Sequence, residues 1–330
     1  MIDFLSNPEW IRPQTDFLLF LQNIRINSSI IFDKLFLCIT IFGEIWLPTL
    51  ICALIYWCVD FKAGIYLLSL EGINIFFAHF FKMVACVYRP WILDSRIHPS
   101  KLAIPFAKGY SFPSGHSAMS SSVLGGCAYL LRKNKAVSIF LVCLIFTIGF
   151  SRLWLGVHSP QDVVCGLLIG FILVFALNPI TKWAQKDSKR YIILLAIIDV
   201  LAMIALIYTY FFVTYRMDYV SGALLVNPQN LKYVTVVNFG YALGLINGCY
   251  LCAAFCPYNP GESSVKQRII RGIAGAVGII ILLKFLFGYI FMNCIRIRYA
   301  VSITFLTGLA ITLIYPVIFT KLENTSKAKK

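Results

Sequence analysis

Basic and imidazole side chains of this sequence gather where long apolar runs end. Lys82 and Arg89-Pro90 leave one such run, and Arg152 and His158 leave another. Ionisable groups at membrane depth are costly and usually serve a function. Arg presents a planar fork of N–H donors that binds two phosphate oxygens at once, and Lys adds a point charge. These cations predict a site for a phosphate.

A polar segment, Pro113-Ser114-Gly115-His116, opens a further apolar run. The N-terminus of a helix has free N–H groups and a partial positive charge, which favour anions. Glycine allows a close approach because it has no Cβ, so we expect the backbone at Ser114 and Gly115 to help hold the phosphate. His116 and His158 can divide the acid–base work, with one attacking phosphorus and the other protonating the leaving oxygen.

No metal or other cofactor is expected for this chemistry. The sequence has no carboxylate cluster and no His-x-x-x-His pair. Cys249, Cys252 and Cys256 fall at helical spacing, but no His or acid lies near them. Membrane-buried Cys usually packs as a small apolar side chain, and we favour that interpretation over a metal site.

Three segments together match a known family: Lys-x6-Arg-Pro (82–90), Pro-Ser-Gly-His (113–116) and Ser-Arg-x5-His-x3-Asp (151–162). They resemble the three-part signature of the type 2 phosphatidic acid phosphatase superfamily. That family includes lipid phosphate phosphatases, undecaprenyl-diphosphate phosphatases, glucose-6-phosphatase and vanadium haloperoxidases. Every signature position is filled in order, over a quarter of the chain.

The resemblance implies a role for each signature residue. His158 is the implied nucleophile, which forms a phosphohistidine, and Asp162 is the implied acid that orients it. His116 is implied as the general acid for the leaving alcohol and later the base for water. The implied phosphate-binding residues are Lys82, Arg89, Ser114, Gly115 and Arg152. Such enzymes need no metal and are sensitive to vanadate, which mimics the phosphorane.

A purely structural interpretation exists for the third segment. Ser159, Pro160 and Asp162 also fit the start of a helix, as N-cap, first residue and third residue. Capping does not explain His158, nor Arg152 near the end of the preceding run. The two roles are compatible, because an acid in the first helical turn can reach back to the imidazole.

Transmembrane helices must position these residues. The chain is 59% hydrophobic and 13% charged, whereas a soluble domain has about 45–50% apolar residues and about a quarter charged. The apolar residues form runs of about 20, which is the length that crosses a hydrocarbon layer. A soluble enzyme, a disordered chain and a collagen-like fibre are thereby excluded. We predict an all-α, polytopic transmembrane helix bundle with a phosphatase-type catalytic core.

Three domains and about nine spans are expected. Residues 1–34 form an N-terminal interfacial segment, 35–181 the catalytic transmembrane core, and 182–330 additional C-terminal spans and a basic tail. The nine-span layout is similar to that of glucose-6-phosphatase, whereas bacterial lipid phosphatases more often have six spans. The expected spans lie near 35–58, 63–86, 115–131, 136–157, 160–181, 190–213, 234–256, 269–293 and 298–320.

The excess of cations predicts an orientation in the cell membrane. The formal net charge is +15, and Lys and Arg in short loops favour the cytoplasmic side. In the nine-span layout the side that holds the C-terminus carries 15 Lys and Arg residues. The other side carries ten when Lys82, Arg89 and Arg152, which are assigned to phosphate binding, are not counted. The C-terminus is therefore expected in the cytoplasm and the site on the extracytoplasmic side. The early apolar stretch 17–21 is too short for a signal peptide, so we expect the first span to direct insertion.

An integral-membrane, acid phosphatase-like hydrolase of a phosphate monoester or diphosphate is the favoured function. A lipid phosphate is the preferred substrate because the site lies at headgroup level; membrane lipids are the other expected partners, and no nucleic acid is expected. The alternatives are a phosphotransferase that uses the same phosphohistidine, a sugar-phosphate phosphatase, and a non-catalytic transporter or lipid-binding relative. Intramembrane charges such as Glu71 and Lys284 motivate the last of these. For Glu44 and Glu71 we favour interhelical ion pairs or hydrogen bonds over pocket lining.

Overall fold

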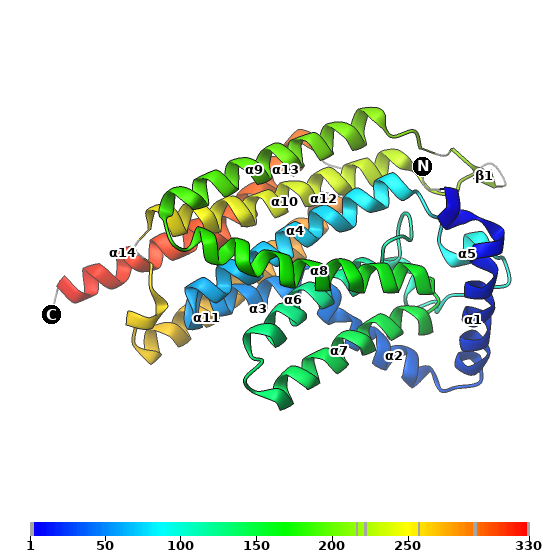
Figure 1. The fold of residues 1–330 in the computed structure, drawn as a ribbon, viewed down its shortest axis with the longest axis horizontal. Helices are drawn as coiled ribbons and strands as arrows, with labels where there is room; N and C mark the ends of the chain where they lie inside the picture. Colours follow the sequence, from blue (N-terminus) through cyan, green and yellow to red (C-terminus); the bar gives the residue numbers. More distant parts are fainter. Residues whose placement is uncertain (1–2, 216, 221–222, 257, 293–295, 329–330) are drawn as a thin grey trace. The chain divides into compact units, whose positions relative to one another are not determined.

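The computed structural model describes residues 3–215, 217–220, 223–256, 258–292 and 296–328. The side chain of Lys284 and those of the basic tail from residue 323 onward lie outside the described residues. Helices dominate the rest, which confirms the all-α, polytopic class (Figure 1).

The N-terminal half contains the helices that carry the signature. Its helical elements are η1 (Asp3–Ser6), α1 (Pro8–Ile26), α2 (Ile30–Ile39), η2 (Thr40–Gly43), α3 (Trp46–Leu54), η3 (Ile55–Val59), α4 (Phe61–Ala85), α5 (Pro90–Leu93), η4 (Ile104–Phe106), α6 (Gly115–Leu130), α7 (Lys135–Trp154) and α8 (Pro160–Ala184).

The C-terminal half is helical apart from one short hairpin. Strands β1 (Tyr219–Val220) and β2 (Ala223–Leu224) pair antiparallel, with Tyr219 opposite Leu224. The helical elements are α9 (Ser188–Ile207), η5 (Tyr208–Phe212), α10 (Pro228–Phe255), η6 (Pro260–Glu262), α11 (Val265–Ile280), η7 (Ile281–Leu286), α12 (Phe287–Met292), α13 (Ile297–Leu309), η8 (Ala310–Ile314) and α14 (Tyr315–Ala328).

Seven helices in the described part of the chain are long and apolar enough to cross a membrane, or up to eight if a bent pair is one span. The bent pair consists of Pro8–Ile26 and Ile30–Gly43, at 120° to each other. The region expected as the span 35–58 is divided, because the chain turns after Gly43 and only Trp46–Val59 remains as a shorter apolar helix. The region expected at 115–131 forms α6, a helix of 16 residues.

The chain divides into two compact units. The first unit comprises Met1–Glu44, Phe77–Ile172 and Ala205–Thr235, and the second comprises Ile45–Phe76, Leu173–Ile204 and Val236–Lys330. Every signature residue lies in the first unit.

Small residues bring α6 and α8 close together in the first unit. A Cβ built on Gly166 would lie 2.6 Å from the carbonyl oxygen of Ser114, and one on Gly170 would lie 2.0 Å from Ser121 Oγ. The close approach lets the backbone N–H of Ser114 donate to the carbonyl of Asp162 over 2.9 Å. Two signature segments, 113–116 and 151–162, are thereby joined at the starts of their helices although 34 residues of chain separate them.

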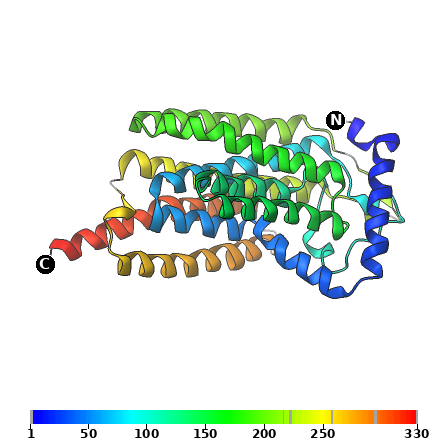
Figure 2. The same cartoon turned by 60° about the horizontal axis from the view of Figure 1, so that its bottom comes forward.

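Helix α1 lies across the adjacent ends of α7 and α8 (Figure 2). The indole Nε1 of Trp10 donates to Gln161 Oε1 over 2.5 Å, and Gln161 N donates to Gln14 Oε1 over 2.9 Å. Arg25 Nη1 donates to the carbonyl of Trp154 over 3.1 Å. The predicted interfacial segment therefore holds the connection that contains His158.

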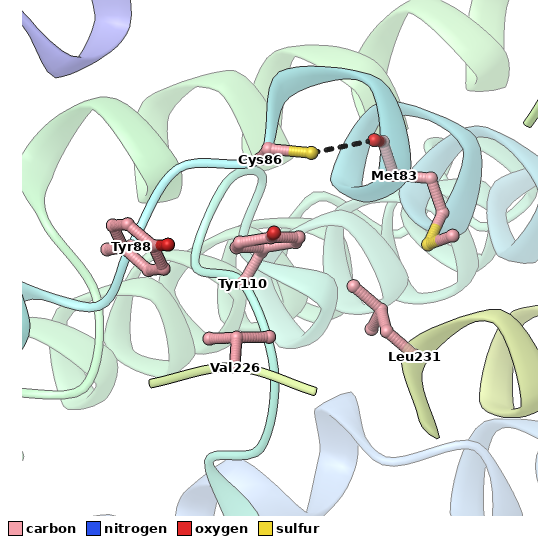
Figure 3. Packing of buried hydrophobic residues seen from close by; sticks show 6 residues of the cluster. All are labelled: Met83, Cys86, Tyr88, Tyr110, Val226 and Leu231. Atoms are coloured by element: carbon pink, nitrogen blue, oxygen red, sulfur yellow. Dashed lines mark hydrogen bonds between the residues drawn. The ribbon is translucent and has the colours of Figure 1, made fainter. Parts of the chain in front are cut away.

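A buried apolar cluster ties the segment after η5 to the end of α4 (Figure 3). Tyr88 and Tyr110 pack in it between residues from distant parts of the chain, and Tyr88 OH donates to Asp218 Oδ2 over 2.6 Å. The members of the cluster are Met83, Cys86, Tyr88, Tyr110, Val226 and Leu231. The cluster supports the backbone next to Arg89.

The second unit is held by close helix contacts and buried polar groups. A Cβ on Gly244 would lie 2.1 Å from the carbonyl oxygen of Phe305, so α10 and α13 touch through their backbones. Glu71 accepts a hydrogen bond from Thr49 Oγ1, which lies 2.8 Å from Tyr241 OH. Glu71 is thus engaged in interhelical hydrogen bonds, as the sequence predicted.

Candidate active site

The two cations of the first signature segment lie at the end of α4. Lys82 is in the last turn of this helix, and the backbone then turns at Cys86, which has a φ of 51°. Only a few per cent of non-glycine residues adopt this left-handed conformation. After the turn the chain runs extended to Arg89, the N-cap of the short helix α5. Arg89 therefore lies beyond the end of α4, where its guanidinium contacts Val157 and His158.

His158 and Asp162 form the centre of the site. His158 Nδ1 lies 3.4 Å from Asp162 Oδ2, and both side chains are buried. The same carboxylate oxygen accepts a 2.7 Å hydrogen bond from the backbone N–H of Ser159. Asp162 thus caps the start of α8 and also faces the imidazole. Its structural role as a helix cap is therefore compatible with a role in orienting His158.

Ser111 is a third member of this centre and was missed by the sequence analysis. Its hydroxyl donates to Asp162 Oδ2 and lies 3.3 Å from His158 Nδ1. Its backbone N–H donates to the carbonyl of Val87 over 2.7 Å, which fixes its place beside the Arg89 segment. Ser111 belongs to no signature segment, and nothing in its spacing to His158 marks it.

Arg89 determines which nitrogen of His158 carries the proton. Its Nη1 lies 3.0 Å from His158 Nε2 and also donates to the carbonyl of Val157 over 2.8 Å. A guanidinium can only donate, so Nε2 must offer its lone pair, and the proton of a neutral ring lies on Nδ1. Donation to Gly109 O over 3.2 Å and to Lys108 O over 3.0 Å anchors the rest of the guanidinium.

Burial and surrounding cations hold the pKa of His158 well below its usual value near 6.5. Desolvation is the largest cause, and the positive charges of Arg89, Arg152 and Lys82 add to it. Both effects disfavour an imidazolium. His158 is therefore neutral at neutral pH, with an unprotonated Nε2 whose lone pair faces Arg89, and an unprotonated nitrogen is the form a nucleophile needs.

Arg152 and Lys82 are the other two cations that act on His158. Arg152 is buried, and its Nη1 donates to Thr40 Oγ1 over 3.0 Å. Within the described part of the chain, Arg152 Nε has no hydrogen-bond acceptor. Thr40, like Ser111, was not found from the sequence, because it lies outside the signature. Lys82 acts on both imidazoles through its charge.

The start of α6 brings His116 and Gly115 to the same site. His116 Nε2 lies 3.8 Å from Glu44 Oε1. A Cβ built on Gly115 would meet none of the described atoms within 4 Å, so there is open space in front of this backbone. Ser114 differs from the expectation, because its backbone N–H is bonded to Asp162 O rather than free for an anion. The first-turn backbone N–H groups of Gly115 and His116 have no acceptor within their own helix.

Positive charge exceeds negative charge around His158, where Arg89 and Arg152 are buried and Lys82 is partly buried. Lys82, Arg89 and Arg152 are the three cations that act on His158, and Asp162 is the one acid that the described residues place against its ring. Unpaired buried charge is costly, and an anion between the cations would compensate it. Within the described residues no group of three or more His, Cys, Asp or Glu side chains could hold a metal ion.

Comparisons with known proteins found two family profiles and several relatives that match the chain. The profile of the PAP2 superfamily matches residues 63–186, and a PAP2 superfamily phosphatase transmembrane extension matches residues 236–328. The chain is 30% identical to a lipid A 4'-phosphatase of Bacteroides thetaiotaomicron, over 57% of this chain and 85% of that protein. No solved structure matches the chain.

Two further relatives match shorter stretches. A phosphatidylglycerophosphatase B of Bacillus subtilis is 34% identical over 32% of this chain and 53% of its own length. An undecaprenyl-diphosphatase of Sulfolobus acidocaldarius is 31% identical over 40% of this chain and 61% of its own length. Because the lipid A 4'-phosphatase and both family profiles match, the chain belongs to the PAP2 superfamily. It is an integral-membrane phosphatase of that family.

Proposed function

We propose that this protein hydrolyses the phosphate monoester or diphosphate of a lipid through a phosphohistidine at His158. The observation that carries the proposal is the surplus of buried cations around a neutral imidazole whose Nε2 lone pair faces Arg89. The relatives named above act on lipid A, phosphatidylglycerophosphate and undecaprenyl diphosphate. Their shared feature is a phosphate on a membrane-anchored molecule, which supports a lipid phosphate here.

The proposed reaction has two steps, formation of the phosphohistidine and its hydrolysis. The phosphate docks between Lys82, Arg89 and Arg152, and His158 Nε2 attacks phosphorus while the bond to the leaving oxygen breaks. His116 donates a proton to that oxygen. His116 then takes a proton from water, which attacks the phosphohistidine and breaks its P–N bond. Asp162 keeps the Nδ1–H tautomer and stabilises the positive charge on the ring, as the buried Asp of a Ser-His-Asp triad does.

A panel of substrates tests this function. Purified protein is given phosphatidic acid, phosphatidylglycerol phosphate, undecaprenyl diphosphate, lipid A and glucose 6-phosphate, and released phosphate is measured with and without vanadate. We expect vanadate-sensitive release from at least one lipid, and greater release than from glucose 6-phosphate. His158→Ala abolishes it.

His98→Ala is the matched control. This imidazole is exposed, and the contacts of His98 with α1 are made by its backbone. The control therefore retains full activity. Full activity of His158→Ala would refute the assigned nucleophile. Label found on an acceptor instead of in free phosphate would establish transfer in place of hydrolysis.

A further inference from the structure

The turn formed by η2 and Glu44 packs directly on the first turn of α6. A Cβ built on Gly43 would lie 2.8 Å from both Cβ and the carbonyl oxygen of His116, so only glycine permits this contact. The backbone N–H of Glu44 donates to the carbonyl of Ile41 over 3.0 Å, which closes the turn. The Glu44 carboxylate is thereby held 3.8 Å from His116 Nε2.

The same turn also contacts Arg152, one of the residues expected to bind the phosphate. Thr40, at its start, accepts the 3.0 Å hydrogen bond from Arg152 Nη1. One short segment therefore contacts two functional side chains, the imidazole of His116 and the guanidinium of Arg152. It lies 38 residues or more before the first signature residue, so it belongs to none of the three signature segments.

A general acid surrounded by cations needs a compensating charge. The charged groups that act on His116 are Arg152 and Lys82, which oppose its protonated form, and Glu44, which favours it. A carboxylate within about 4–6 Å stabilises an imidazolium. The distance of 3.8 Å is longer than a hydrogen bond, and catalytic hydrogen bonds often shorten only when substrate is bound.

We propose that Glu44 is the positioning residue of His116, which deepens the function proposed above and rests on it. Glu44 faces Nε2, so Nδ1 is the nitrogen that serves the leaving group. The Nδ1–H bond breaks as the leaving oxygen gains its proton, and the neutral ring keeps its Nε2–H toward Glu44. In the second step Nδ1 takes the proton from water. His116 and His158 thus use opposite nitrogens, each oriented by its own carboxylate.

Leaving-group dependence separates this role from a structural one. p-Nitrophenol leaves without a proton, whereas an alkyl alcohol needs one. We expect Glu44→Gln to lower kcat about 100-fold for a short-chain alkyl phosphate, the scale of general acid catalysis. The loss for p-nitrophenyl phosphate should stay within about fivefold, and KM should change little for both. Glu9→Gln, the same change at an exposed carboxylate, leaves both rates unchanged. An equal loss with both esters, or no loss with either, would overturn the proposal.

Glu44→Asp and a spectroscopic readout guard against misfolding and against failure of the proposed function. Aspartate keeps the negative charge but places it farther from His116. The kcat of Glu44→Asp should therefore lie between those of wild type and Glu44→Gln, with the same dependence on the leaving group. Nitrogen-15 NMR of labelled His116 needs no turnover. Wild type should carry the neutral-ring proton on Nε2, and Glu44→Gln should lose that preference. The same tautomer in both proteins refutes the role of Glu44 even if no lipid is hydrolysed, whereas a changed tautomer without hydrolysis refutes only the proposed function.

Discussion

At the scale of single residues, His158 lies between two partners of opposite charge. Arg89 donates to Nε2, and Asp162 faces Nδ1 at 3.4 Å. This arrangement gives one tautomer and keeps the ring neutral. Ser111 and the backbone of Ser159 satisfy the same carboxylate oxygen. The contacts that orient the proposed nucleophile thus exist before any substrate binds.

The lowered pKa of His158 predicts an acid-dependent loss of stability. In the unfolded chain the imidazole titrates near 6.5, whereas in the folded protein its pKa lies well below that value. Below pH 6.5 the unfolded state therefore binds a proton that the folded state does not, and stability falls as the pH falls. At pH 5.5, one unit below the pKa of the unfolded imidazole, the loss from this residue is on the order of 1 kcal/mol.

Thermal unfolding in detergent between pH 5 and pH 7.5 measures this effect. His158→Ala removes the titrating group, so the variant should lose less stability than wild type over this interval. His98→Ala, at an exposed imidazole, should keep the pH dependence of wild type. Parallel curves for wild type and His158→Ala would show that the pKa of the buried ring is not lowered.

At the scale of elements, the site depends on the contact between α6 and α8. The helix starts meet because Gly166 and Gly170 have no side chain, and Ser114 N then reaches Asp162 O. Helix α1 holds Gln161, in the first turn of α8, through hydrogen bonds with Trp10 and Gln14. The catalytic segments are therefore positioned by helix packing as well as by their own sequence.

Gly170→Val tests the importance of this helix contact. A Cβ at this position would lie 2.0 Å from Ser121 Oγ and 2.6 Å from the backbone nitrogen of Ser122. Such crowding costs about 1–3 kcal/mol or more and separates the helices. We expect a lower midpoint of thermal unfolding and a loss of most phosphatase activity.

Gly278→Val is the matched control in another helix. None of the described atoms lies within 4 Å of a Cβ built on Gly278, so its activity and unfolding midpoint should equal those of wild type. If both valine variants behave alike, the contact between α6 and α8 does not support the site.

At the scale of the whole molecule, composition alone predicted a helical membrane protein, and the helices of the two units are of that kind. The break at Gly43–Glu44 was missed because the apolar run continues on both sides of it. Gly43 and Pro48 are local signals for a break, and the close contact of Gly43 with His116 appears only in the folded chain. The signature segments were found because their spacing is local. Ser111 and Thr40 were missed because they meet His158 and Arg152 only in the folded chain.

The proposed orientation in the membrane is a prediction for the intact molecule. Cysteine is placed at Ser95, an exposed residue of the loop before α6, or at Lys186, an exposed residue between α8 and α9. We expect a membrane-impermeant maleimide to label Ser95→Cys in intact cells. It should label Lys186→Cys only after permeabilisation, because cationic loops favour the cytoplasm. Signal above the wild-type cysteine background is measured, and the reverse pattern would place the site in the cytoplasm.

Trapping of the phosphoenzyme tests whether His158 is phosphorylated during turnover. Wild-type protein is mixed with a lipid phosphate labelled with phosphorus-32, quenched in alkali within milliseconds, and digested for peptide mapping. A phosphohistidine survives alkali and is lost in acid, so we expect acid-labile label on the peptide that contains His158, and none in His158→Ala. Label on another residue, or rapid phosphate release by wild type with no labelled peptide at any time, would show that His158 is not the nucleophile.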